Sequence, residues 1–158
     1  MKDSMYFYDA APGRILIVEN GSALIKLCFA DTKKAGSPDA KLKDTPLLKE
    51  AAAQLDEYFA GRRRRFELPL LLEGTPFQLK VWEALQDIPY GQTRSYGQIA
   101  HAIGNMRASR AVGMANSKNP LSIIIPCHRV IGADGRLVGY GGGLERKSYL
   151  LNLEKLNS

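Results

Sequence analysis

The sequence Ile-Pro-Cys-His-Arg-Val at residues 125–130 sets a thiol beside an imidazole inside an otherwise apolar run of this 158-residue chain. Residues 123–124 and 131 extend the apolar run on both sides. A buried strand normally excludes a His-Arg pair, because both side chains need hydrogen-bond partners away from water. Cys127 is therefore either inert packing or, with His128 as the neighbouring base, a thiolate nucleophile.

The coupling of Cys127 to His128 depends on the backbone between them. Adjacent side chains on an extended segment point to opposite sides, so the pair communicates only through a bridging water or a turn at Cys127. A neutral imidazole then takes the thiol proton, and a carboxylate usually orients such a histidine. The candidates in this half of the chain, among which spacing does not choose, are Glu73, Glu83, Asp87, Asp134, Glu145 and Glu154.

The outcome depends on the carbon that the thiolate attacks. Attack on a saturated carbon gives a thioether, which water does not cleave, so such a protein works once. Attack on an acyl carbon gives a thioester, which hydrolyses and allows turnover. The residues alone leave both outcomes open. His101, the only other histidine, lies on a predicted helix and is interpreted as a surface or packing residue.

Three helices are predicted before this stretch. The first begins at Thr75 and Pro76, as N-cap and first-turn residues. A short helix capped by Ser95 covers about residues 96–103, and another covers about residues 107–115. A helix, a Gly-containing turn and a second helix outline a helix-turn-helix.

The helix over residues 107–115 is unusual for a reader of the major groove, because Arg110 is the long side chain in the middle of a run of small residues. The small residues are Ala108, Ser109, Ala111, Gly113 and Ala115. They allow a close approach, which is either tight packing on the core or insertion into a narrow groove with the arginine projecting inward.

The rest of this half is predicted to deliver and enclose Cys127. Residues 116–120 form a loop, the apolar run that follows is a strand, and residues 132–135 form a turn. Residues 139–143 (Gly-Tyr-Gly-Gly-Gly) form a loop whose backbone passes near a ligand or adopts positive φ. A helix over residues 144–156 closes the chain. Its apolar positions are Leu144, Leu150, Leu151 and Leu153.

The first half predicts a small sheet and one helix. Residues 14–30 form two strands around an Asn20-Gly21 turn, with Cys28 as inert packing in the second strand. Residues 31–45 form a surface loop. A helix then begins at Thr45-Pro46 and ends at Gly61.

Four arginines at residues 62–65 follow that helix. They either contact phosphates or, as we favour, complement the negative end of the helix dipole. Residues 66–72 predict an edge strand, because Pro69 cannot donate to a ladder. Glu73-Gly74 marks the boundary between a supporting domain over residues 1–73 and a second domain over residues 74–158.

Composition narrows the class of protein. The apolar fraction is 45% and the charged fraction 24%, values typical of globular proteins. No apolar run approaches the roughly 20 residues of a membrane span, and no signal-peptide pattern follows the first residues, so a cytoplasmic protein is expected. Two cysteines and two histidines argue against a disulfide framework or a structural zinc site.

The net charge of +6 favours a polyanionic partner such as nucleic acid. Residues 73–158 hold 10 basic and 6 acidic residues, against 12 and 10 in residues 1–72, so most of the excess lies near Cys127.

Residues 125–130 resemble the active-site signature of the O6-alkylguanine-DNA alkyltransferases, also called methylated-DNA–protein-cysteine methyltransferases. Four further stretches resemble the family in order and spacing across residues 75–154. They are residues 91–96 (GQTRSY), 109–113 (SRAVG), 119–120 (NP) and 139–144 (GYGGGL). The resemblance implies an α/β (α+β) fold. A small ribonuclease H-like domain of sheet plus helix precedes a mostly helical domain with a winged helix-turn-helix.

By this resemblance, Cys127 accepts an alkyl group from O6-alkylguanine, and to a lesser extent from O4-alkylthymine, once and irreversibly. His128 deprotonates Cys127 through water, Glu154 orients His128, and Asn119 holds the turn that presents the cysteine. Tyr96 donates a proton to the departing guanine and helps to rotate the nucleotide.

The resemblance also implies the DNA contacts. Arg110 fills the gap left by the extruded base, and the small residues Ala108, Ser109, Ala111 and Gly113 line the DNA-binding helix. Tyr140, Gly141 and Val130 line the base pocket. The implied partner is double-stranded DNA, bound by a monomer through the minor groove, without cofactor, metal or membrane.

The sequence departs from the family pattern at two points, and three other functions are considered. Gly141 stands where some relatives have serine, and the first half lacks the Cys and His residues of a zinc site that some relatives carry. The alternatives are a lesion-binding module without transfer, a cysteine hydrolase with turnover, and a helix-turn-helix regulator of undamaged sites.

Overall fold

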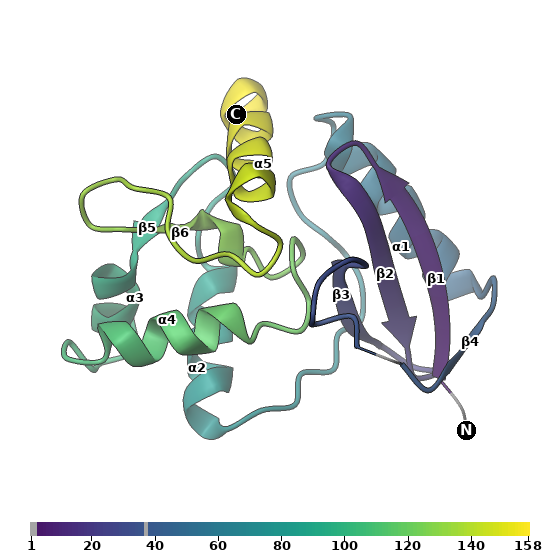
Figure 1. Cartoon of the computed structure of the whole chain (residues 1–158), viewed down its shortest axis with the longest axis horizontal. Helices are drawn as coiled ribbons and strands as arrows, with labels where there is room; N and C mark the ends of the chain where they lie inside the picture. Colours follow the sequence, from purple (N-terminus) through teal and green to yellow (C-terminus); the bar gives the residue numbers. More distant parts are fainter. Residues whose placement is uncertain (1–2, 37) are drawn as a thin grey trace. The chain divides into compact units, whose positions relative to one another are not determined.

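Four strands form the sheet of the first of two units into which the chain divides, Met1–Leu72 and Glu73–Ser158. The computed structural model describes residues 3–36 and 38–158. The strands are β1 (Asp3–Ala10), β2 (Gly13–Glu19), β3 (Leu24–Phe29) and β4 (Ala40–Leu42), in the order β3-β2-β1-β4 (Figure 1). β1 and β2 pair antiparallel, as do β2 and β3, and β4 runs parallel to β1.

The predicted pair of strands around Asn20-Gly21 is confirmed. The side-chain oxygen of Asn20 accepts hydrogen bonds from the backbone N–H groups of Ser22 and Ala23, and Gly21 has a φ of 101°. Cys28 is buried in a cluster with Leu16 and Val18, and burial raises the pKa of its thiol, so its packing role also holds.

Three features of this unit differ from prediction. β1 carried no clear alternation in the sequence and was not predicted. The predicted loop over residues 31–45 contains β4. The predicted edge strand over residues 66–72 is wrong, because only Leu70 forms a bridge, to Leu24. Buried Gln54 instead exchanges two hydrogen bonds with the backbone of Glu67 and holds this segment irregular.

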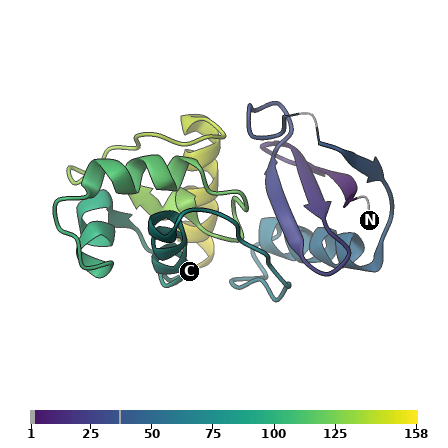
Figure 2. The ribbon, with the colours of Figure 1, turned by 90° about the horizontal axis from the view of Figure 1, so that it is seen from below.

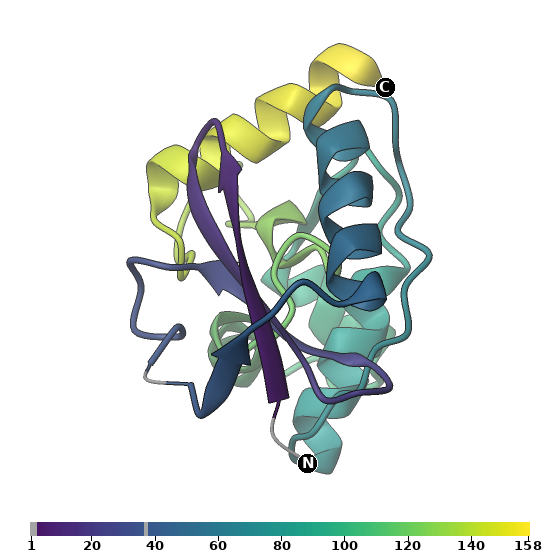
Figure 3. The same cartoon turned by 90° about the vertical axis from the view of Figure 1, so that its right-hand side faces the viewer.

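Helix α1 (Pro46–Phe59) packs on β1 and β2 and lies along the sheet (Figure 3). Thr45 caps it as predicted, accepting the N–H of Leu48, and donates its own hydroxyl proton to buried Glu19 at 2.5 Å. The helix ends before the arginine run, and its last turn contains no basic residue. The dipole interpretation of residues 62–65 stays a prediction. Within this run, Arg63 pairs with Glu57.

The second unit is mostly helical. Its helices are α2 (Pro76–Gln86), α3 (Tyr96–Ala102), α4 (Ser109–Ser117) and α5 (Leu144–Asn157). Helices α2, α3 and α4 pack together as a cluster (Figure 2). Thr75 and Ser95 both form capping boxes, which explains why these two helix starts were predictable. α4 begins and ends two residues later than predicted.

The apolar run before Cys127 does not form the predicted strand. The strands of this unit in the described part of the chain are the short pair β5 (Arg94–Ser95) and β6 (Val130–Ile131), which run parallel. Between α4 and β6 the chain forms a tight turn and one turn of 3-10 helix, η1 (Cys127–Arg129). No helix in the described residues is long and apolar enough to cross a membrane.

Candidate active site

Cys127 begins the 3-10 turn η1, so the backbone turns at the cysteine instead of continuing as a strand. The N–H of Cys127 donates to the carbonyl of Ile125 at 2.7 Å. Just before it, Ile123 has a φ of 72°, which is rare for a β-branched residue and persists only where the surroundings impose it. The structure therefore has the turn at Cys127 that the sequence analysis considered.

Two buried asparagines impose this turn. Asn119 donates from Nδ2 to the carbonyl of Ile125 at 2.8 Å and accepts the N–H of Leu121 at 3.0 Å. Asn116, in the last turn of α4, donates from Nδ2 to the carbonyl of Cys127 at 3.3 Å. Asn119 was predicted to hold the turn. Asn116 was placed in a loop, and its contact with the cysteine was not predicted.

Glu154 is the one of the six candidate carboxylates that hydrogen-bonds to His128 in the described residues. Its side chain on α5 is 1% exposed. Oε2 lies 2.7 Å from Nε2 of His128, while Arg129 donates from Nε to Oε1 at 2.7 Å and from Nη2 to Oε2 at 3.0 Å. The N–H of Gly91 adds a bond to Oε1 at 3.2 Å. One carboxylate therefore ties together η1, α5 and the turn at Gly91.

The charge on Glu154 fixes the tautomer of His128. Burial raises the pKa of Glu154, but the hydrogen bonds from His128 and Arg129 and the positive charge of Arg129 outweigh it and hold that pKa well below its usual range. An ionised carboxylate only accepts hydrogen bonds, so Nε2 of His128 carries the proton. Nδ1 is then an acceptor. It is buried and has no hydrogen-bond partner among the described residues.

His128 is neutral in this environment. Its complete burial lowers the pKa of the imidazole, Glu154 raises it, and the positive charges of Arg129 and Lys147 lower it again, with a net shift downward. A neutral imidazole with a bare nitrogen is a proton acceptor. The pair Cys127 and His128 thus has the chemistry of a thiol with its base.

Lys147 is a buried cation that the sequence analysis missed. It is 0% exposed, although the predicted apolar position Leu144 on the same helix is 49% exposed. Its Nζ donates to the carbonyls of Val130 at 2.5 Å, Val138 at 2.9 Å and Gly139 at 3.5 Å. Lys147 thereby joins β6 to the start of the predicted pocket loop.

Tyr96 and Tyr140 lie in the electrostatic neighbourhood of Cys127. Burial raises the pKa of both phenols, and the nearby Cys127 raises it further. The hydroxyl of Tyr96 donates to the carbonyl of Val138 at 2.9 Å, the oxygen that also accepts from Lys147. The Tyr140 hydroxyl is buried without a hydrogen-bond partner among the described residues. Val130 is fully buried and Gly141 is exposed.

The predicted DNA contacts lie on α4 and its start. Arg110 and Ala111 are exposed, Ser109 and Gly113 are half-buried, and Ala108 is buried at the N-cap. Gly113 packs against Tyr96 of α3, where an added Cβ would lie 3.8 Å from the ring. The packing interpretation therefore holds for Gly113, and insertion of this helix into a groove stays a prediction.

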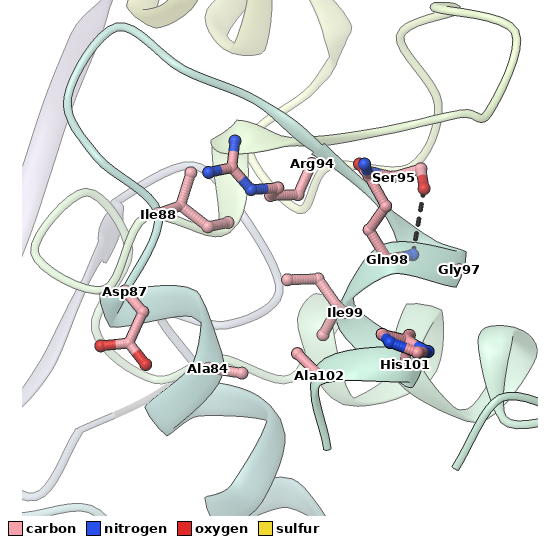
Figure 4. Close-up of a pocket in the computed structure, with 10 residues that line it drawn as sticks. All are labelled: Ala84, Asp87, Ile88, Arg94, Ser95, Gly97, Gln98, Ile99, His101 and Ala102. Carbon is pink, nitrogen blue, oxygen red and sulfur yellow. Dashed lines mark hydrogen bonds between the residues drawn. The ribbon is translucent and has the colours of Figure 1, made fainter. Parts of the chain in front are cut away.

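A hollow of about 550 Å³ lies elsewhere in this unit, between the end of α2 and α3 (Figure 4). Asp87, at the C-cap of α2, and His101, on α3, line it but do not point toward one another (Figure 4). The guanidinium of Arg94 donates hydrogen bonds to the carbonyl of Thr93 and to the side-chain oxygen of Gln92. Exposed His101 is a surface residue, as predicted.

Family models match both units. The DNA binding domain of 6-O-methylguanine DNA methyltransferase matches residues 76–156, and its ribonuclease-like domain matches residues 5–72. A methylated-DNA–protein-cysteine methyltransferase of Mycobacterium leprae is 52% identical over 147 residues, which cover 93% of this chain and 89% of that protein. One from Methanosarcina acetivorans is 48% identical over 153 residues, covering 95% and 98%.

A solved structure matches nearly the whole chain. The crystal structure of Mycobacterium tuberculosis OGT in complex with DNA has a TM-score of 0.90 and 46% identity, covering 98% of this chain and 94% of that one. Fold, site and similarity define a DNA-binding transferase of DNA repair. The chain belongs to the family of methylated-DNA–protein-cysteine methyltransferases, which confirms the resemblance and the fold class.

We expect the pH dependence of stability to reveal buried Lys147. Burial lowers its pKa from 10.5 to about 8, so between these values the unfolded chain holds a proton that the folded chain has lost. The free energy of unfolding then rises with pH in this window, by up to about 1.4 kcal/mol per pH unit from this group. Urea unfolding of the wild type and of Lys147→Met across the window measures the difference between them. A difference that does not vary with pH contradicts the assignment.

Proposed function

We propose that this chain repairs DNA by transferring the alkyl group of O6-alkylguanine, and to a lesser extent of O4-alkylthymine, to Sγ of Cys127. His128 takes the thiol proton at Nδ1 through a bridging water. The thiolate then attacks the alkyl carbon, the bond from that carbon to O6 breaks, and its electron pair leaves with the guanine. Tyr96 donates a proton to the departing base, and the proton taken up by His128 then restores the phenol, so the net transfer is of the thiol proton to guanine. The thioether is stable to water, so each molecule reacts once.

The observation that carries this proposal is the neutral, buried His128 beside Cys127. Its Nε2 is committed to Glu154, while Nδ1 has no hydrogen-bond partner among the described residues. Asn119 positions the turn, and Glu154 positions the histidine. No cofactor enters the reaction, because substrate and acceptor together balance the bonds.

We infer that the base enters by shifting the loop over residues 138–143. Cys127 is 2% exposed, so a base reaches the sulfur only when neighbouring groups move. Tyr96 and Lys147 both hold the carbonyl of Val138. An entering base exchanges the Tyr96 bond for its own contact, which also frees the hydroxyl for proton donation. Tyr140, Gly141 and Val130 then line the base.

DNA binding is assigned to residues 74–158, with residues 1–73 as support. We propose that α4 enters the minor groove of duplex DNA, where Arg110 fills the space of the extruded nucleotide. Ala108, Ser109, Ala111 and Gly113 permit the close approach. Extrusion costs a few kcal/mol, and less for a lesion that pairs poorly. The protein acts as a monomer, in the cytoplasm, where the thiol of Cys127 stays reduced.

Transfer to Cys127 predicts a stoichiometric change in mass. After incubation with an O6-methylguanine duplex, the wild type should gain one methyl group on the peptide that contains Cys127. Cys127→Ala should gain none while still binding the duplex. Cys28→Ala, which removes the other buried cysteine, should react like the wild type. Intact-protein mass spectrometry measures all three.

Each failure points to a different alternative. If the Cys127→Ala variant gains a methyl group, Cys127 is not the acceptor. If the wild type binds the lesion without gaining mass, the protein is a binding module. If each chain releases more than one molecule of repaired product, it is a hydrolase.

Arg110→Ala should slow repair of duplex DNA by about tenfold, the effect of losing roughly 1.4 kcal/mol of stabilisation of the extruded state. Its reaction with free O6-benzylguanine should change much less, because a free base needs no extrusion. Lys80→Ala, which removes an exposed cation from α2, controls for charge. Single-turnover rates provide the measurement, and equal losses on both substrates argue against a role in base flipping.

A further inference from the structure

A second long side chain projects from α4 beside Arg110. Met114 follows Arg110 by four residues and is 64% exposed. Residues three and four apart are neighbours on a helix surface, and Arg110, Ala111, Met114 and Ser117 are all exposed. They form one exposed stripe, opposite the buried Val112, Ala115 and Asn116. The sequence analysis treated Arg110 as the long side chain of this run and overlooked the methionine.

The charged residues near Met114 in the sequence indicate what kind of partner it contacts. Residues 105–119 contain no acidic residue, and the exposed Arg107, Arg110 and Lys118 are cationic. An exposed methionine on a segment whose charged side chains are all cationic matches a partner that is anionic along its backbone and apolar between its charges. Duplex DNA has this pattern, with phosphates flanking the deoxyribose walls of the minor groove.

We propose that Met114 is the apolar anchor of the DNA interface, packing against the wall of the minor groove and the base step beside the extruded nucleotide. The inference rests on the proposed function, which places α4 in that groove. Proteins that open the minor groove often do so with an apolar side chain against a base step. The unbranched, polarisable thioether of methionine adapts to such a surface.

The spacing sets the position of this contact. Four residues of α-helix rise about 6 Å, close to two base steps at about 3.4 Å each. While Arg110 occupies the lesion position, Met114 contacts the duplex within about two base pairs of it. It keeps the groove open on that side, so its contribution appears only when the substrate is a duplex.

The test compares Met114→Ala with Met114→Leu, which keeps an apolar side chain of similar size. On an O6-methylguanine duplex at limiting protein, Met114→Ala should react about tenfold more slowly, as expected for loss of a buried apolar side chain. Met114→Leu should recover most of the rate. Leu156→Ala, which removes an 85% exposed apolar side chain from α5, is the matched control and should react like the wild type.

Salt dependence identifies the kind of contact. Phosphate contacts determine the slope of log affinity against log salt, so Met114→Ala should bind the duplex more weakly with an unchanged slope. The loss on duplex should exceed any loss on free O6-benzylguanine by about tenfold. A slope that falls by about one unit, or equal losses on both substrates, overturns the proposal.

Two further outcomes separate this inference from the function beneath it. If the wild type gains a methyl group and Met114→Ala repairs duplex equally fast, the inference fails and the proposed function stands. If the wild type gains no methyl group, the proposed function fails first. If the substitution changes sedimentation of the free protein instead of its DNA affinity, the occupant of this stripe is a second copy of the chain, and the inference is wrong.

Discussion

One buried carboxylate, that of Glu154, holds the reactive part of this protein together. It accepts hydrogen bonds from the neighbouring residues His128 and Arg129 and from Gly91, which lies on a distant segment of the sequence. Two charges out of water are costly, and only close geometry and further hydrogen bonds repay that cost. Arg129 meets the requirement with two bonds to Glu154 and a third to the carbonyl of Ile88. The ionised carboxylate then leaves His128 one role, with Nε2 as donor and Nδ1 as base.

The same unit links this centre to the helix assigned to DNA. Asn116 at the end of α4 holds the carbonyl of Cys127, and the indole of Trp82 on α2 donates to the carbonyl of Ala115 at 2.9 Å. The last turn of α4 is thus hydrogen-bonded to the backbone of the acceptor, while the exposed stripe lies on the other face of the same helix. On this account, a helix seated in the groove brings the acceptor with it, and the only movement needed is that of the loop held by Tyr96 and Lys147.

Local signals in the sequence were enough for several elements, whereas the choice of Glu154 among six carboxylates came from the family resemblance. Helix starts at Thr45, Thr75 and Ser95 could be predicted because N-capping hydrogen bonds join residues that are close in the sequence. The strand predicted before Cys127 failed because an apolar run does not distinguish a strand from a buried turn, and the turn is set by Asn116 and Asn119. Lys147 and Arg129 went unassigned because their partners are carbonyls and a carboxylate that only the folded chain brings near. On α5 the sequence pattern favoured Leu144 for the core, whereas the fold buries the lysine.

The central claim is that burial keeps His128 neutral while Glu154 holds its proton on Nε2, which leaves Nδ1 free to accept the proton of Cys127. Nitrogen-15 NMR of the imidazole reports this directly, since the two ring nitrogens differ in chemical shift with protonation. At neutral pH the account predicts a proton on Nε2 and none on Nδ1. A doubly protonated ring, or a proton on Nδ1 with Nε2 bare, would contradict it.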